Sequence, residues 1–270
     1  MKAILVTGGG SGIGRAVATL FAARGWRVGL ADIDARGLAE TAAQLPGERC
    51  STHVMDVRDP SEWEHVLAEF TAISEGRLDV LFNNAGIAVS GAFGDMALEE
   101  LDRVVDVNFR GVAYGARLAY PYLKATPGAC LLNTASASAI YGSAGLAAYS
   151  ATKFAVRGLT EALDAEWAAD GVRVRSLMPG FIDTNLLATR VGGTTRTARE
   201  TVMAAGLEFT PVETVAQVAW EAAHGERLHS PIGRTARRLT FAARWLPERL
   251  RRSMRRRVLG RVPGRVPGRG

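Results

Sequence analysis

The stretch from residue 3 to residue 24 constrains the fold of this chain more than any other. An apolar run at residues 3–7 leads directly into a glycine-rich loop, Gly8 to Gly14, and then into an amphipathic run from Arg15 to Arg24. Glycines permit a tight turn and a close approach of the backbone to a ligand, and unpaired N–H groups at a helix N-terminus attract anions. Strand, loop and helix in this order therefore predict a cradle for a phosphorylated ligand.

Strand-like and helix-like segments then alternate along the chain, and the helix after the third strand is expected to be capped near Ser61. This alternation predicts a doubly wound parallel sheet with right-handed crossovers, in which ligands bind beyond the carboxyl ends of the strands. Those ends carry Gly8, Asp32, Asp56 and Asn83. The expected strands occupy residues 3–7, 27–31, 50–57, 79–82, 130–134 and 172–177.

Asp32 follows the second strand, eighteen residues beyond Gly14. A dinucleotide-binding fold places at about this distance the acid that binds the adenosine ribose. A carboxylate accepts hydrogen bonds from the ribose hydroxyls and repels a 2′-phosphate, so Asp32 favours NAD(H) over NADP(H). The alternative is an ordinary turn or helix-capping aspartate, with Asp34 as another candidate for the cap of the next helix.

Tyr149 and Lys153 are four residues apart, which places them on the same face of a helix. In water both side chains titrate near pH ~10. A fixed positive charge beside a phenol favours the phenolate and lowers the tyrosine pKa, so this pair can do acid–base work at neutral pH. The alternative is a solvated helix face with no chemical role.

Three ordered motifs, Thr7-Gly8-x-x-x-Gly12-x-Gly14, Asn83-Asn84-Ala85-Gly86 and Tyr149-x-x-x-Lys153, closely resemble those of the classical short-chain dehydrogenase/reductase family, over residues 1–224. The resemblance implies a single-domain, Rossmann-like α/β fold and hydride transfer between a secondary alcohol and NAD⁺. It further implies that Tyr149 takes the hydroxyl proton and that Ser136 holds the developing carbonyl oxygen. Lys153 would lower the tyrosine pKa and bind the nicotinamide ribose.

The resemblance also assigns further residues by position, and the catalytic set that it implies is Asn108, Ser136, Tyr149 and Lys153. Asn108 would hold a water beside the lysine, although it could instead bond backbone within its own helix. Ser138 is an alternative to Ser136 as the nearby hydroxyl. The residues implied to contact the cofactor are Gly8, Ser11, Gly12, Ile13, Gly14, Asp32, Ile33, Asp56, Val57, Asn83, Ala85, Gly86, Tyr149, Lys153, Pro179, Gly180, Ile182 and Thr184.

The substrate region is expected mostly in residues 184–210, which look like the mobile lid of the family. The expected pocket walls suggest an apolar alcohol or ketone such as a lipid, a steroid or a hydrophobic ketone. A different hypothesis is a non-catalytic NAD(H)-binding sensor or scaffold tethered through the tail, but the intact Ser136, Tyr149 and Lys153 argue against it. The substrate contacts that we expect are Phe93, Ser138, Tyr141, Phe181 and Leu187.

Positive charge is concentrated at the C-terminus, where residues 225–270 hold fourteen arginines and two glutamates. The preceding residues are mildly acidic, so charge gives no support for nucleic-acid binding by the body. We expect a catalytic domain at 1–233, a basic amphipathic helix at 234–259 interrupted at Pro247, and a disordered tail at 260–270.

Three roles are open for the helix at 234–259. Packing against the body or a partner subunit is favoured, contact with an anionic membrane surface is second, and nucleic acid is last. The usual family ending, a last strand with an acid and paired glycines, is replaced by residues 227–233. This puts the usual tetramer in doubt, and either a homodimer or a homotetramer is expected.

The cysteines and the apolar segments indicate the cellular compartment in which the protein is expected. Cys50 and Cys130 lie far apart without metal-binding or redox spacing, which indicates buried thiols in a reducing compartment and no metal site. The four histidines lie outside every motif and are interpreted as structural or surface residues. No signal peptide and no apolar run of ~20 residues is recognised. We therefore expect a cytoplasmic protein that could be peripheral to the membrane.

Overall fold

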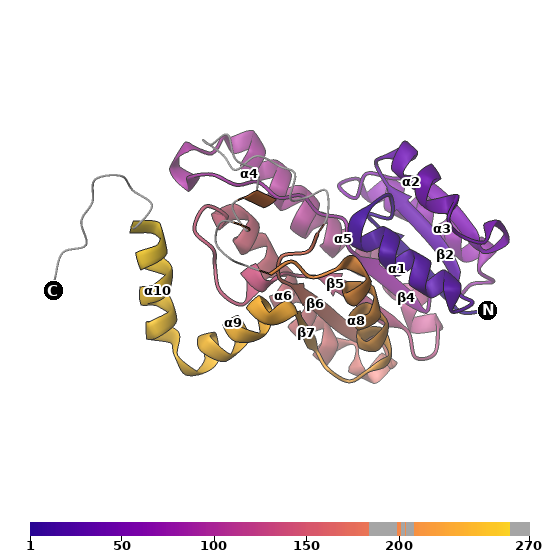
Figure 1. Ribbon diagram of the computed structural model, residues 1–270. Coiled ribbons are helices and arrows are strands. Elements are labelled where there is room, and N and C mark those ends of the chain that lie inside the picture. The colour runs from indigo at the N-terminus through magenta and orange to yellow at the C-terminus, as the bar shows by residue number, and fades with distance from the viewer. Residues whose placement is uncertain (184–198, 201–202, 204–207, 260–270) are drawn as a thin grey trace.

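The computed structural model describes residues 1–183, 199–200, 203 and 208–259 of the chain. Its centre is a seven-stranded parallel sheet with the strand order β3-β2-β1-β4-β5-β6-β7 (Figure 1). The strands are β1 Ala3–Thr7, β2 Arg27–Asp32, β3 Cys50–Val54, β4 Val80–Asn83, β5 Cys130–Thr134, β6 Arg173–Pro179 and β7 His229–Ile232. The described helices are α1 Gly12–Ala23, α2 Ala35–Ala42, α3 Pro60–Ile73, α4 Leu98–Val105, α5 Gly111–Ala125, α6 Ala147–Glu166, α8 Val212–His224, α9 Gly233–Trp245 and α10 Pro247–Leu259.

Helices cover both faces of the sheet, as the alternating sequence predicted. Successive side chains of β1 point to opposite faces: Ile4 and Val6 pack in a core with α1 and α8, while Ala3 and Leu5 pack in a second core with α3 and α5. All four are fully buried. Burial on both faces explains why the strand has a continuous apolar sequence without polar alternation.

The third strand is shorter than the sequence predicted. It ends at Val54 rather than at residue 57, so Asp56 and Val57 lie in the loop that follows. The cap of α3 is also corrected, because the Asp59 carboxylate accepts the Ser61 backbone N–H at 2.8 Å. Proline at the first helical position fits this start, since the N–H that it lacks has no partner there in any helix.

The usual family ending was expected to be replaced at residues 227–233, and this expectation was wrong for its strand, although the acid and paired glycines do not follow it in the sequence. Residues His229–Ile232 form β7, which pairs in parallel with β6. Helix α9 begins immediately after it at Gly233, whose φ of +85° lies in the left-handed region that glycine tolerates. A Cβ at this position would lie 2.6 Å from the Thr210 hydroxyl, so the turn from strand to helix is tight.

The C-terminal extension forms two helices, and the predicted interruption at Pro247 is confirmed. One side of α9 packs on the body, where Ala236 is fully buried and Leu239 and Ala243 are partly buried. The expected amphipathic helix does not bury all its leucines, because Leu246, at the break between the two helices, is 40% exposed. Among the described residues, no helix is long and apolar enough to cross a bilayer.

Candidate active site

A cleft of about 600 Å³ lies where the glycine loop, the ends of several strands and the start of α6 meet. Asn108, Gly14 and Asn83 are close to this cleft without lining it, Phe93 and Tyr141 are absent from its walls, and Thr184 and Leu187 fall outside the described residues. The predicted residues that do line the cleft are Gly8, Ser11, Gly12, Ile13, Asp32, Ile33, Asp56, Val57, Ala85, Gly86, Ser136, Ser138, Tyr149, Lys153, Pro179, Gly180, Phe181 and Ile182.

The glycine loop is shaped by backbone that other residues adopt with difficulty. Gly8 and Gly12 have φ angles of +67° and +49°. Gly14 lies beneath the loop, where a Cβ would come within 2.0 Å of the Gly8 carbonyl oxygen. Helix α1 therefore begins directly against the loop, and no side chain caps its N-terminus. The arrangement leaves room and free donors for a phosphate group.

Asp32 lies at the end of β2 and faces the loop. Its Oδ2 accepts the Gly10 backbone N–H at 2.9 Å, and its Oδ1 accepts the Asp34 N–H at 3.0 Å. Asp34 is the cap of α2, since its carboxylate accepts the Arg36 N–H at 3.1 Å. The capping role that was the alternative for Asp32 thus belongs to Asp34, and the Asp32 carboxylate remains at the cleft wall.

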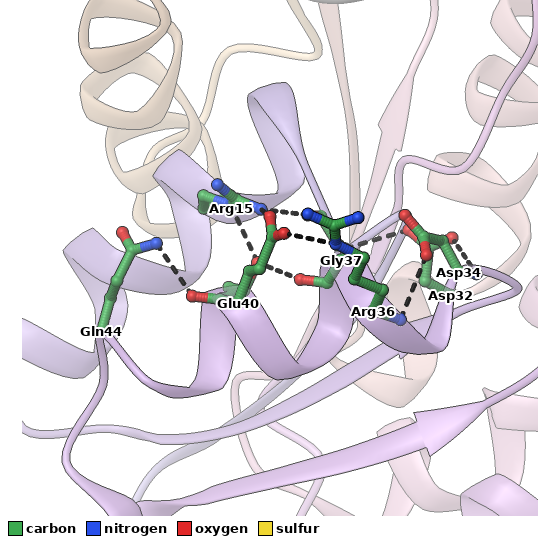
Figure 2. A network of polar contacts seen from close by, with 9 residues as sticks. Arg15, Asp32, Asp34, Arg36, Gly37, Glu40 and Gln44 are labelled. Atoms are coloured by element: carbon green, nitrogen blue, oxygen red, sulfur yellow. Dashed lines mark hydrogen bonds and ion pairs between the residues drawn. The ribbon is translucent and has the colours of Figure 1, made fainter.

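A network of polar contacts links helices α1 and α2 (Figure 2). Arg15 of α1 donates from Nη2 to the Gly10 carbonyl oxygen at 2.6 Å and from Nε to the Thr41 hydroxyl at 2.9 Å. Glu40 of α2 pairs with Arg15 at 3.3 Å and with Arg36 at 3.0 Å. Helix α2 is thereby tied to the glycine loop, although neither arginine lines the cleft.

The two adjacent asparagines after β4 have different surroundings. Asn83 is buried, and its Nδ2 donates to the Val112 carbonyl oxygen at 3.1 Å and to Asn133 Oδ1 at 3.2 Å. Asn84 lines the cleft, and its Nδ2 donates to the Thr7 carbonyl oxygen at 3.0 Å. The structure therefore brings Asn84, which the sequence did not single out, to the position where Asn83 was expected.

Asn108 is fully buried in a short π-helical turn between α4 and α5. Such turns are rare and occur frequently at functional sites. The Asn108 Oδ1 accepts the Ile87 N–H at 2.8 Å and its Nδ2 donates to the Ile87 carbonyl oxygen at 2.9 Å. The amide therefore bonds the backbone of a different segment, not that of its own helix, and it fixes the loop that carries Gly86.

Ser136, Tyr149 and Lys153 meet at the wall of the cleft. Ser136 follows β5, and its hydroxyl accepts the Ser138 N–H at 3.1 Å. Burial raises the pKa of the Tyr149 phenol above its ordinary value, and a hydrogen bond with Ser136 opposes that rise. Ser136 rather than Ser138 is therefore the serine that bonds the Tyr149 phenol, although both serines line the cleft.

Lys153 lies one turn beyond Tyr149 on α6, with its ammonium 5.7 Å from the centre of the tyrosine ring. Its Nζ donates to the Thr134 carbonyl oxygen at 2.8 Å. Burial lowers the pKa of Lys153 to about 8, because the charged form is poorly solvated. In this structure the group that lowers the Tyr149 pKa is Ser136, and burial outweighs it.

Sequence reasoning also missed Arg58 and two residues of α9. Arg58 lines the cleft beside Asp56, which it binds with its Nη2 at 2.6 Å and whose pKa it lowers. Thr235 and Leu239 reach the cleft from α9. Nothing local in the sequence marks these two, because they come to the cleft only through the packing of α9 on β6 and β7.

The cysteines and histidines lie away from the cleft. Cys130 is buried in β5, and burial raises its thiol pKa to about 12. The buried His53 bonds Ser51 and Glu69. Within the described part of the chain, no group of three or more His, Cys, Asp or Glu side chains is arranged to hold a metal ion.

Comparison with known proteins identifies relatives of both sequence and structure. The family described as short chain dehydrogenase matches residues 2–193. Meso-2,3-butanediol dehydrogenase from Serratia marcescens is 38% identical over 185 residues, which cover 68% of this chain and 73% of that protein. An uncharacterized oxidoreductase of Staphylococcus aureus is 36% identical over 188 residues, which cover 70% of this chain and 81% of that protein.

Two solved structures share the architecture. The crystal structure of levodione reductase aligns with a TM-score of 0.74 at 30% identity and covers 82% of this chain and 90% of its own. The 3-ketoacyl-(acyl-carrier-protein) reductase from Brucella melitensis, solved in complex with NADH, aligns with a TM-score of 0.76 at 28% identity. That alignment covers 85% of this chain and 95% of the reductase chain.

Proposed function

Because the chain belongs to the classical short-chain dehydrogenase/reductase family, we propose that it interconverts a secondary alcohol and a ketone with NAD(H), using Tyr149 as general base and acid. The observation that carries this proposal is the meeting of Ser136, Tyr149 and Lys153 at one wall of the cleft. The relatives named for butanediol and for levodione support an alcohol or ketone substrate.

The cleft fits a nicotinamide nucleotide. Gly8 and Gly12 line the cleft, and Gly14 gives the close packing of loop and helix that a phosphate cradle needs. Asp32 would bind the ribose hydroxyls. The bound cofactor would supply the hydride acceptor or donor.

The side chains of this chain would handle the proton. Tyr149 would take the alcohol proton in oxidation and return it in reduction, while the Ser136 hydroxyl donates to the substrate oxygen. The hydrogen bond with Ser136 counters the burial that raises the Tyr149 pKa. A protonated Lys153 beside the ring would add to this by favouring the phenolate. General acid–base catalysis of this kind contributes about 10²–10⁴-fold in rate.

The substrate that we propose is apolar. Phe181, Leu146 and Leu239 lie on the cleft wall beyond the catalytic residues. Aliphatic and aromatic walls favour a hydrophobic alcohol or ketone because its burial releases apolar surface from water. We further propose a cytoplasmic homodimer or homotetramer built on the catalytic domain of residues 1–233.

A screen tests this function. The protein is incubated with NAD⁺ and a panel of secondary alcohols, or with NADH and the matching ketones, and NADH absorbance is followed. We expect turnover of apolar substrates that Tyr149→Phe abolishes. Tight NAD(H) binding without turnover of any substrate would instead favour the sensor or scaffold hypothesis, and turnover that survives in Tyr149→Phe would refute the assignment of the base.

A further inference from the structure

Helix α9 has two faces of opposite character. The inner face packs on the body through Ala236, Leu239 and Ala243. The outer face exposes Phe241 and Trp245, whose surfaces are 61% and 63% accessible to solvent. Residues four apart lie on the same face of a helix, so Phe241 and Trp245 share the outer face. Because the inner face is fixed by packing, the aromatic pair is held pointing outward.

The aromatic pair is surrounded by positive charge. The Arg244 guanidinium lies 5.3 Å from the centre of the Trp245 ring, and Arg234 is only partly neutralised by Glu208 at 3.4 Å. Between Gly233 and Leu259 the chain has ten arginines and one glutamate. The exposed arginines of α9 are Arg234, Arg237, Arg238 and Arg244.

Helix α10 extends this charge away from the catalytic body. Figure 1 shows α10 standing beside the body at the end of α9. Its one acidic residue, Glu248, pairs with Arg251 at 2.9 Å. Leu250 is buried, while arginines occupy exposed positions on both sides of it.

We propose that the outer face of α9, together with α10, binds an anionic lipid surface. Exposed aromatic rings favour the headgroup region of a bilayer, and arginines bind lipid phosphates. The charge of the face argues against a second copy of itself as the occupant, because two such faces would place arginines against arginines. Packing against the body, which the sequence favoured, accounts for the inner face of α9 and leaves the outer face for the lipid.

Co-sedimentation of the full chain with vesicles of equimolar phosphatidylcholine and phosphatidylglycerol tests the proposal. Each arginine near such a surface contributes about fivefold to binding. Arg238→Glu, which changes the charge by two, should therefore weaken binding about thirtyfold at low salt. The matched control is Arg117→Glu, the same change at an exposed position of α5, and it should retain full binding.

The aromatic pair is tested separately from the charge. Phe241→Ser with Trp245→Ser should weaken vesicle binding at least tenfold while the melting temperature stays unchanged, because both rings are exposed. Vesicles of phosphatidylcholine alone should bind weakly. A chain ending at Leu259 should bind as the full chain does, which separates the two helices from the residues beyond them.

Three results would overturn the proposal. The first is absence of binding to anionic vesicles at low salt. The second is an equal loss of vesicle binding in Arg238→Glu and Arg117→Glu, or full binding by the aromatic variant. Either result would show that the vesicles attract the protein by its net charge alone. The third is a fall in oligomeric mass in the aromatic variant with unchanged vesicle binding, which would make this face an interface between subunits.

Discussion

Removing the charge of Asp32 should move cofactor preference from NAD(H) toward NADP(H). The carboxylate would face the 2′-position of a bound adenosine ribose, where NADP(H) carries a phosphate. Two unit charges about 4 Å apart repel by about 4 kcal/mol at an effective dielectric constant of 20, which is roughly a thousandfold in affinity. Solvent in the open cleft reduces this value, so we expect Asp32→Asn to change the affinity ratio of the two cofactors by at least tenfold.

Asp32→Asn should also lower the free energy of unfolding, because Asp32 holds two backbone N–H groups. Asp32 accepts the Gly10 and Asp34 N–H groups at 2.9 and 3.0 Å. Asparagine keeps one side-chain oxygen, so it can satisfy one of the two donors, and a hydrogen bond to a charged group contributes about 1.5–3 kcal/mol. We therefore expect a modest loss of unfolding free energy, together with weaker NAD(H) binding.

Titration calorimetry with each cofactor separates these effects. The matched control is Asp34→Asn, which removes the same charge two residues away in a carboxylate that caps α2. Asparagine is an equally good cap, so this variant should retain both its fold and its cofactor ratio. If Asp32→Asn leaves the ratio within twofold, or if Asp34→Asn shifts it as much, selection by the Asp32 charge is refuted.

Three further predictions follow from the same cleft. Tyr149→Phe should reduce turnover at least a hundredfold while the cofactor dissociation constant, measured by fluorescence, stays within a few-fold. Gly14→Ala places a Cβ 2.0 Å from a loop carbonyl oxygen and should lower both cofactor affinity and melting temperature, whereas Gly47→Ala, where a Cβ meets no atom within 4 Å, should change neither. Burial lowers the pKa of Lys153 from 10.5 to about 8. Between these two values the unfolded state binds more protons than the folded state, so the free energy of unfolding in urea should rise from about pH 8 to about pH 10.5. Lys153→Met should remove that rise.

The sheet and one side of the cleft were predictable because their signals are local. A strand buried on both faces must be apolar throughout, and the loop after it needs glycine where φ is positive, as at Gly8 and Gly12. Tyr149 and Lys153 share a face of α6 by helical spacing alone. These features depend on residues that are close in the sequence, so pattern and chemistry suffice to place them.

The surroundings that the sequence could not predict are those that distant segments decide. Asn83 and Asn84 are chemically identical, and only the contacts of Asn83 with Val112 and Asn133 determine which amide is buried and which reaches the cleft. Likewise, the partner of Asn108 is the backbone of Ile87, on a loop that precedes it by about twenty residues. Pairing with β6 defines β7, whose proline and histidine give little strand signal of their own.

Helix α9 shows why composition alone could not assign the C-terminal extension. Its sequence has leucines, aromatic residues and arginines, which predicted an amphipathic helix. The small side chain of Ala236 lies fully buried on the inner face, which allows the helix to approach the body closely enough for Leu239 to line the cleft. The larger Phe241 and Trp245 are left outside. One short helix therefore joins the wall of the cleft to a charged, aromatic outer surface, so substitutions on its two faces should separate an effect on the cleft from an effect on the binding of lipid.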